Sequence, residues 1–272
     1  MNISIFNETM VDWSWQELEA RKGNTVLLPL GVIEEHGPHL PLGSDIYFSY
    51  GICQRIQQEV ERLGGSCVIA PPMFWGINYC TGGFPGSFSL RPETMKMLLA
   101  DIFADFKRFG FNRVICVNEH GDPLHIQTIL ESVQEANQKG MRVQLLMEPY
   151  ELKDYGVTDL DCVLVDEAEY PPELFGEGEG LDIHAGAYET AALYGLYPEM
   201  IKETDGLPDY SLNRETIRTW MGGGESVKTV VPLGYAGNPA HWQGMKEKVK
   251  GIFEILCQFV AQKIVEGDNE RA

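Results

Sequence analysis

The chain has 272 residues, of which 44% are hydrophobic, and 21 basic against 40 acidic residues give it a net charge of −19. A negative charge of this size repels nucleic acid and anionic membrane surfaces, so we expect neither as a partner. No apolar run is long enough to cross a bilayer, and the N-terminal stretch lacks the basic start and apolar core of a signal peptide. We therefore expect a cytoplasmic protein and, because no linker is evident, one domain over residues 1–272.

Apolar, strand-like runs alternate with amphipathic, helix-like runs along the chain. We expect strands over 25–33, 67–70, 113–117, 142–147 and 228–231. We expect helices over 47–63, 91–109, 123–138, 212–220 and 240–265. On the buried side of the second helix we place Met97, Leu98, Ile102, Phe103 and Phe106. This alternation predicts a three-layer α/β/α sandwich around a mainly parallel sheet.

The alternation stops over about 151–180, where many acidic residues accompany the single basic residue Lys153. We interpret this stretch as an acidic excursion outside the core. A run of carboxylates is most simply a solvated face, and a flexible lid or a subunit contact is the alternative.

The six cysteines are scattered without C-x-x-C spacing, and several lie in apolar surroundings. Such cysteines are typical of reduced, buried thiols. Cys80, beside Thr81-Gly82-Gly83, is the one expected closest to a functional site, but nothing supports a nucleophilic role for it.

The segment E-E-H-G-P-H-L-P-L-G-S-D over residues 34–45 directly follows the first strand. Glu34 and His36, two apart in an extended chain, point the same way, and Asp45 can close a site from beyond the turn. Carboxylate and imidazole groups suit divalent ions such as Zn, Mn or Fe. The alternative is a polar turn in which Ser44 or Asp45 caps a helix.

A second cluster, N-E-H-G-D over residues 118–122, directly follows the strand at 113–117. His120 and Asp122 are again two apart. Ligands in an open α/β sheet collect outside the carboxyl ends of the strands, so the two clusters could face one site. Right-handed crossovers would place the Glu34 and His120 loops at the same edge. Asp122 before Pro123 is also typical of a helix start, which explains Asp122 but not His120.

These residues resemble the creatininase (creatinine amidohydrolase) family. Its E-x-H-G-P-H-L-P-L-x-x-D signature matches residues 34–45. Its F-P-G-[ST]-x-S, N-x-H and H-A-G-x-x-E-T elements match residues 84–89, 118–120 and 184–190 in the same order. A weaker G-x-x-G-[DN]-P element matches 234–239. The resemblance therefore spans roughly residues 25 to 245.

The resemblance implies two divalent metal ions per subunit, with Zn, Mn or Fe as the candidates. The implied ligands are Glu34, His36, Asp45, His120 and Asp122. Asp45 would bridge the ions, joined by Glu34 and His120 on one ion and by His36 and Asp122 on the other.

The resemblance also implies catalytic roles for His184 and Glu189. His184 would be the general acid that protonates the departing group, a task suited to a side chain that titrates near neutrality. Glu189 would be a proton acceptor or an additional metal contact. We assign Asn78, Gly121 and Asp182 to substrate binding.

We therefore expect a dinuclear-metal hydrolase in which metal-bound hydroxide attacks the carbonyl of a small, polar, cyclic substrate, as in amidohydrolase-type ring opening. The pocket departs from creatininase, which has an aromatic residue where this chain has Gly121 and a substrate-stacking tryptophan where it has Leu181. Three alternatives stay open: hydrolytic ring opening of a keto-inositol, as by a 3-dehydro-scyllo-inosose hydrolase, deformylation of a formamide, and a non-enzymatic accessory protein that keeps the metal site. The resemblance further implies a homo-oligomer, specifically a hexamer.

Overall fold

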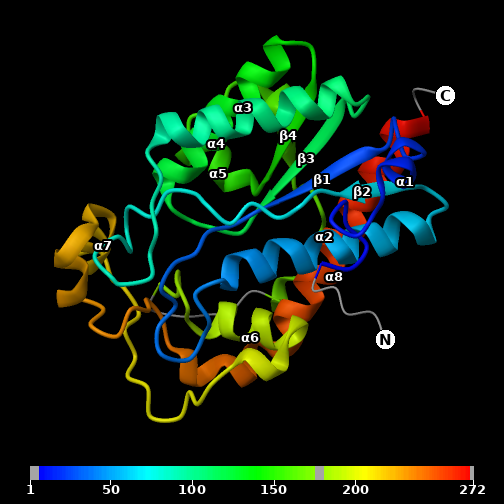
Figure 1. Cartoon of the computed structure of the whole chain (residues 1–272). Helices are drawn as coiled ribbons and strands as arrows, with labels where there is room; N and C mark the ends of the chain where they lie inside the picture. Colours follow the sequence, from blue (N-terminus) through cyan, green and yellow to red (C-terminus); the bar gives the residue numbers. More distant parts are fainter. Residues whose placement is uncertain (1–5, 175–180, 270–272) are drawn as a thin grey trace.

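The computed structural model describes residues 6–174 and 181–269. At its centre lies a five-stranded sheet in the order β2-β1-β3-β4-β5, and all four strand pairs are parallel (Figure 1). The strands are β1 (Thr25–Leu30), β2 (Cys67–Ile69), β3 (Arg113–Asn118), β4 (Arg142–Met147) and β5 (Val163–Val165).

Helices connect and cover these strands. The α-helices are α1 (Trp15–Glu19), α2 (Ser44–Arg62), α3 (Pro92–Arg108), α4 (Pro123–Gln138), α5 (Pro149–Asp154), α6 (Ala187–Leu196), α7 (Thr216–Gly222) and α8 (Trp242–Asn269). Short 3₁₀ turns are η1 (Leu160–Cys162), η2 (Pro172–Leu174), η3 (Pro198–Met200), η4 (Gly224–Thr229) and η5 (Pro239–His241). None of the described helices combines the length and the apolar character needed to cross a membrane.

Successive side chains of each strand point to opposite faces of the sheet and so build two separate cores. In β1, Leu27 packs into the cluster that contains residues of α2, α6 and α8. Its neighbours Val26 and Leu28 pack into the other cluster, with residues of α3 and α4. Figure 1 shows these helix groups on opposite sides of the strands. The predicted three-layer α/β/α sandwich is therefore confirmed.

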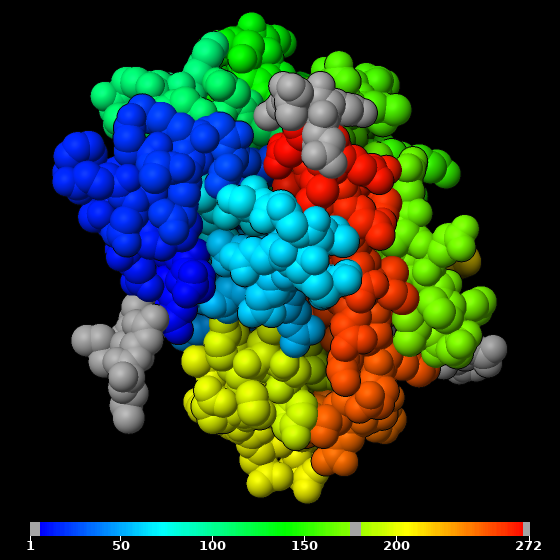
Figure 2. Space-filling model, turned by 90° about the vertical axis from the view of Figure 1, so that its right-hand side faces the viewer, coloured from blue at the N-terminus to red at the C-terminus, as the bar shows by residue number. Residues whose placement is uncertain are grey.

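The long helix α8 is tied to the sheet by a buried cation. Arg113, at the start of β3, is 1% exposed and donates hydrogen bonds to the carbonyl oxygens of Ile264 (3.1 Å) and Lys263 (3.0 Å). In Figure 2 the red and orange surface of α8 lies beside the cyan surface at the end of α2. These bonds bring the C-terminal part of the described chain back against the beginning of β3.

Three local expectations were wrong. Residues 228–231 are not a strand, because η4 and the turn after it place Val227 and Val231 in a small core with Trp220, and this packing outweighs the β propensity of the valines. The stretch 151–180 is not wholly outside the core, because β5 pairs with β4 at the edge of the sheet. The helix expected over 212–220 is α7, which begins at Thr216.

The buried face of α3 is also rotated from the one expected. Phe103 is 1% exposed, as predicted, but Met97 is 70% exposed. The buried residues are Met95, Leu99 and Phe103, spaced four apart on one helix face. Residues 175–180, at the end of the expected acidic excursion, lie outside the described residues.

Candidate metal centre

The candidate site lies at the carboxyl ends of β1 and β3. Leu30 is paired with Asn118, so the segments that carry Glu34 and His120 leave the sheet side by side, as predicted. Gly31 determines how closely α2 approaches them, because a Cβ atom there would lie 2.7 Å from the backbone carbonyl carbon of Asp45. A glycine at this position thus allows Asp45, in the first turn of α2, to reach the strand ends.

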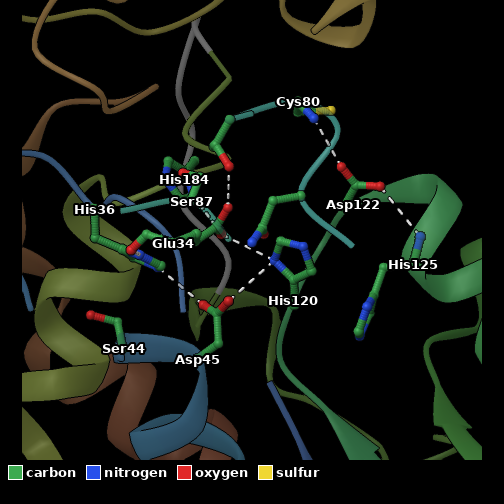
Figure 3. Close-up of polar contacts among 12 residues, drawn as sticks. Glu34, His36, Ser44, Asp45, Cys80, Ser87, His120, Asp122, His125 and His184 are labelled. Atoms are coloured by element: carbon green, nitrogen blue, oxygen red, sulfur yellow. Dashed lines mark hydrogen bonds and ion pairs between the residues drawn. The ribbon is translucent and has the colours of Figure 1, made fainter. Parts of the chain in front are cut away.

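Three of the predicted ligands meet in one buried group, Glu34, Asp45 and His120. The Nδ1 atom of His120 lies 3.0 Å from Glu34 Oε1 and 3.1 Å from Asp45 Oδ2. All three residues are at most 5% exposed. Figure 3 shows these side chains converging on one point.

A second group of potential ligands consists of Glu34, His36 and His184. His184 Nδ1 lies 3.6 Å from Glu34 Oε1, and the rings of His36 and His184 are 4.5 Å apart between centroids. His36 Nε2 also lies 3.0 Å from Asp45 Oδ1. Glu34 is therefore shared by both groups, while Asp45 contacts a histidine of each. His184, expected at the leaving group, lies close enough to be a ligand.

Each of these histidines has one ring nitrogen directed at a backbone carbonyl oxygen. The contacts are His36 Nδ1 to Glu34 (3.2 Å), His120 Nε2 to Ile77 (2.9 Å) and His184 Nε2 to Glu35 (2.8 Å). A carbonyl can only accept, so that nitrogen carries the proton and the other presents a lone pair. These lone pairs face carboxylate oxygens. Two acceptors face each other favourably with a metal ion or a proton between them, and the mixed imidazole and carboxylate donor set is one that divalent metal ions such as Zn or Mn accept.

The same electrostatics favour protonated rings when no metal ion is bound. Burial would lower the pKa of His120, but the carboxylates of Glu34 and Asp45 raise this pKa well above its ordinary value. Burial likewise opposes the charged form of His184, yet Glu34 and Glu35 raise the pKa of His184 to about 10. A metal ion entering the site would therefore compete with protons.

Two neighbours of these residues were not predicted from the sequence. The Thr81 hydroxyl donates to Glu34 Oε2 at 2.5 Å, which orients that carboxylate. The ring of Trp220 lies 5.3 Å from that of His184 between centroids. The small-residue stretch after Cys80 was a signal for Thr81, whereas no sequence pattern pointed to Trp220. Burial raises the pKa of the Cys80 thiol strongly, in keeping with an inert, structural cysteine.

Asp122 lies outside both groups and caps α4 instead. Its Oδ1 accepts from the backbone N–H groups of Leu124 and His125, and its Oδ2 accepts from those of Tyr79 and Cys80. Figure 3 shows Asp122 turned toward Cys80 and His125, away from Glu34. Stranding a buried donor costs about 1–3 kcal/mol, so the capping arrangement resists rotation of this carboxylate. Asp122 is therefore the N-cap of α4, as the alternative interpretation had it, and does not lie beside the other proposed ligands.

Glu189 lies in the first turn of α6, with Oε2 3.5 Å from His36 Nε2. The same oxygen accepts the backbone N–H of Ala185 at 2.9 Å. Ala185 has φ of 48°, a left-handed conformation that is uncommon for a residue other than glycine. Such strained residues often occur at functional sites, and here the strained residue joins His184 to the helix that carries Glu189.

A cavity of about 700 Å³ opens beside this cluster. Gly121 and Asp182, assigned to substrate binding, both line it. Asn78 is not among its lining residues, and its amide group donates to the carbonyl oxygens of Ile33 and Phe88. The lining also includes Glu119 from the loop after β3, the α5 residues Tyr150, Glu151 and Asp154, and Tyr155 directly after α5. Among the described residues that line this cavity there is no lysine or arginine.

Known proteins resemble this chain in both sequence and fold. Residues 11–264 match the sequence model of the creatininase family, described as creatinine amidohydrolase. The creatinine amidohydrolase of Pseudomonas putida is 29% identical over 204 residues, which are 69% of this chain and 71% of that protein. The 3-dehydro-scyllo-inosose hydrolase of Thermotoga maritima is 26% identical over 179 residues, 65% of this chain and 52% of that protein.

A solved structure of creatinine amidohydrolase (creatininase) superposes with a TM-score of 0.69 at 24% identity, covering 96% of this chain and 97% of that one. At this identity the superposition supports a common fold and nothing further. The family match covers nearly the whole chain, including every motif that contributes to the candidate centre. The chain therefore belongs to the creatininase family, whose members are metal-dependent hydrolases.

Proposed function

We propose that this protein is a dinuclear-metal hydrolase that opens a small, polar, cyclic amide. The observation that carries the proposal is the position of Asp45, whose two oxygens lie 3.0 Å from His36 Nε2 and 3.1 Å from His120 Nδ1. A carboxylate held between two histidines in this way suits a ligand shared by two ions. Glu34 and His120 would hold one ion with Asp45, and His36 would hold the other.

Divalent ions held here would lower the pKa of water, supply hydroxide at neutral pH and polarise a substrate carbonyl. The protein's own groups prepare this chemistry. Thr81 orients Glu34, and the carbonyl oxygens of Ile77 and Glu34 orient the rings of His120 and His36. The Glu35 carbonyl holds the Nε2–H group of His184, so Nδ1 would be the atom that takes up a proton from the attacking water and passes it to a departing nitrogen.

The cavity supports a neutral or cationic substrate. Carboxylates line it on several sides without a lysine or arginine among its described lining residues, so away from the metal ions a phosphate or carboxylate group would find no cationic side chain. Gly121 and Leu181 stand where creatininase has aromatic residues, and Leu181 is 46% exposed. Aromatic surface comes instead from Tyr150, Tyr155 and Trp220. We therefore propose a substrate other than creatinine.

A substrate panel tests the proposal. The protein would be loaded with Zn, Mn or Fe and incubated with lactams, formamides and cyclic polyol ketones, with Asp45→Asn as the inactive control. Cyclic amides should be hydrolysed, and chelation should stop the reaction. Turnover of the polyol ketones alone would instead support the second candidate, hydrolytic ring opening of a keto-inositol, in line with the similarity to the 3-dehydro-scyllo-inosose hydrolase of Thermotoga maritima. If protein that holds its metal turns over none of these substrates, the result would contradict the proposed hydrolase activity and favour an accessory or binding role.

We propose in addition that the protein forms a homo-oligomer, a hexamer by its family resemblance. Light scattering at working concentration measures the mass directly. A monomer would contradict this assembly without affecting the proposed chemistry.

A further inference from the structure

We propose that Glu189, and not Asp122, completes the binding site of the metal ion at His36. The inference rests on the dinuclear function proposed above and specifies the ligands of one of its two ions. It concerns two carboxylates whose hydrogen bonds leave them unequally free to bind a metal.

The first observation is that Asp122 has no free acceptor position. A carboxylate offers about four lone-pair sites, and those of Asp122 receive four backbone N–H donors. Two donors belong to the start of α4 and two to the segment at Tyr79 and Cys80. Turning Asp122 toward an ion would therefore uncap α4 and detach that segment at the same time.

The second observation is that Glu189 keeps most of its acceptor capacity. One oxygen accepts a single backbone N–H, from Ala185, at 2.9 Å. That same oxygen already lies 3.5 Å from His36 Nε2. The side chain is 22% exposed and lines the cavity, so it can be reached by an ion entering from solvent.

The third observation concerns the direction in which His36 points. Its Nδ1 is directed at the Glu34 carbonyl at 3.2 Å, which leaves Nε2 to bind a metal. Nε2 faces the carboxylates of Asp45, at 3.0 Å, and Glu189. An ion bound by Nε2 of His36 would therefore have the carboxylates of Asp45 and Glu189 beside it, and Glu34 is the third carboxylate near this ring.

Metal content distinguishes the two carboxylates. Wild type, Glu189→Gln and Asp122→Asn would be stripped with chelator, reloaded with Zn²⁺ and analysed by mass spectrometry for ions per chain, with Glu151→Gln as the control for loss of a cavity carboxylate. In Glu189→Gln the introduced amide oxygen can still accept from Ala185, so this variant should fold. We expect about two ions in wild type, Asp122→Asn and Glu151→Gln, and about one in Glu189→Gln. Affinity for the second ion should fall at least about tenfold, since even outer partners of a ligand contribute that much.

Electron paramagnetic resonance of Mn²⁺-loaded protein gives a second readout. Wild type should show a coupled pair of ions and Glu189→Gln the spectrum of a single ion. Full retention of both ions in Glu189→Gln would overturn the assignment, as would the loss of one ion from folded Asp122→Asn. If Asp122→Asn fails to fold, the Glu189→Gln result decides alone. A wild-type chain that binds no ions would overturn the proposed function itself and this inference with it.

Discussion

Asp45 places one carboxylate oxygen 3.0 Å from the Nε2 atom of His36. The two residues are held there by different parts of the fold, since Asp45 belongs to the first turn of α2 and His36 to the loop after β1. The other oxygen of Asp45 faces His120, from the loop after β3. One carboxylate thus links the ends of two neighbouring strands.

Replacing Asp45 should remove both metal ions from the centre. We predict that Asp45→Asn loses both ions together, because an amide supplies neither the charge nor two anionic oxygens. Ions per chain after reloading with Zn²⁺ are the measurement. Asp12→Asn, a change at an exposed aspartate, is the matched control and should retain both. Full metal retention in Asp45→Asn would remove the bridging role.

The geometry of His184 is compatible with two roles, that of a general acid and that of a metal ligand. We predict that His184→Ala keeps its metal and loses turnover by about a hundredfold or more, the usual contribution of a general acid. The loss should shrink for substrates with better leaving groups, which need less protonation. His241→Ala, at an exposed histidine, should leave the rate unchanged. Loss of an ion from His184→Ala would make this histidine a ligand, as its distance of 3.6 Å from Glu34 permits.

Thr81 contacts the centre through its hydrogen bond to Glu34. We predict that Thr81→Val weakens metal binding about 10- to 100-fold, the range typical of an outer partner of a ligand. Thr81→Ser keeps the hydroxyl and should restore most of the affinity. Calorimetric titration of stripped protein with Zn²⁺ measures both variants. Equal affinities for the valine and serine variants would show that the hydrogen bond to Glu34 does not tune the centre.

The rotated face of α3 has a direct consequence for stability. We expect Phe103→Ala, at 1% exposure, to lower the free energy of unfolding by about 3–5 kcal/mol, as for other buried phenylalanines. Met97→Ala, at 70% exposure on the same helix, should change it by less than about 0.5 kcal/mol. Urea unfolding measures both. Comparable losses in the two variants would mean that α3 packs through another face.

Glu148, before α5, should make stability depend on pH. Burial, with the nearby carboxylates Asp166 and Glu151, raises the pKa of Glu148 to about 7 from an ordinary value of 4.5. The folded chain therefore binds the proton more tightly than the unfolded chain. This contribution favours folding at low pH and is lost as the pH rises from about 4.5 through 7.

Glu148→Gln removes that titration while keeping an acceptor oxygen. The melting temperature of Glu148→Gln relative to wild type should accordingly be higher at about pH 8 than at about pH 5. Glu167→Gln, at an exposed position, should show no such trend. A pH-independent difference for Glu148→Gln would contradict the raised pKa.

The sequence alone determined the alternation of strands and helices, and with it the layered sandwich, because strand and helix periodicities are local. It also placed Glu34, His36 and His120 after the ends of strands, because each follows an apolar, strand-like run. Its motifs were enough to identify the family, and the single domain over 1–272 stays a prediction.

Only the tertiary structure decided which carboxylates are free to bind metal. Asp122 and Glu189 are equally acidic in the sequence, yet Asp122 is occupied by donors that include Tyr79 and Cys80, which lie more than forty residues away along the chain. Thr81 beside Glu34 and the edge strand β5 beside β4 likewise depend on distant partners. Such contacts leave no local pattern, because hydrogen bonding and packing are satisfied in space and not along the chain.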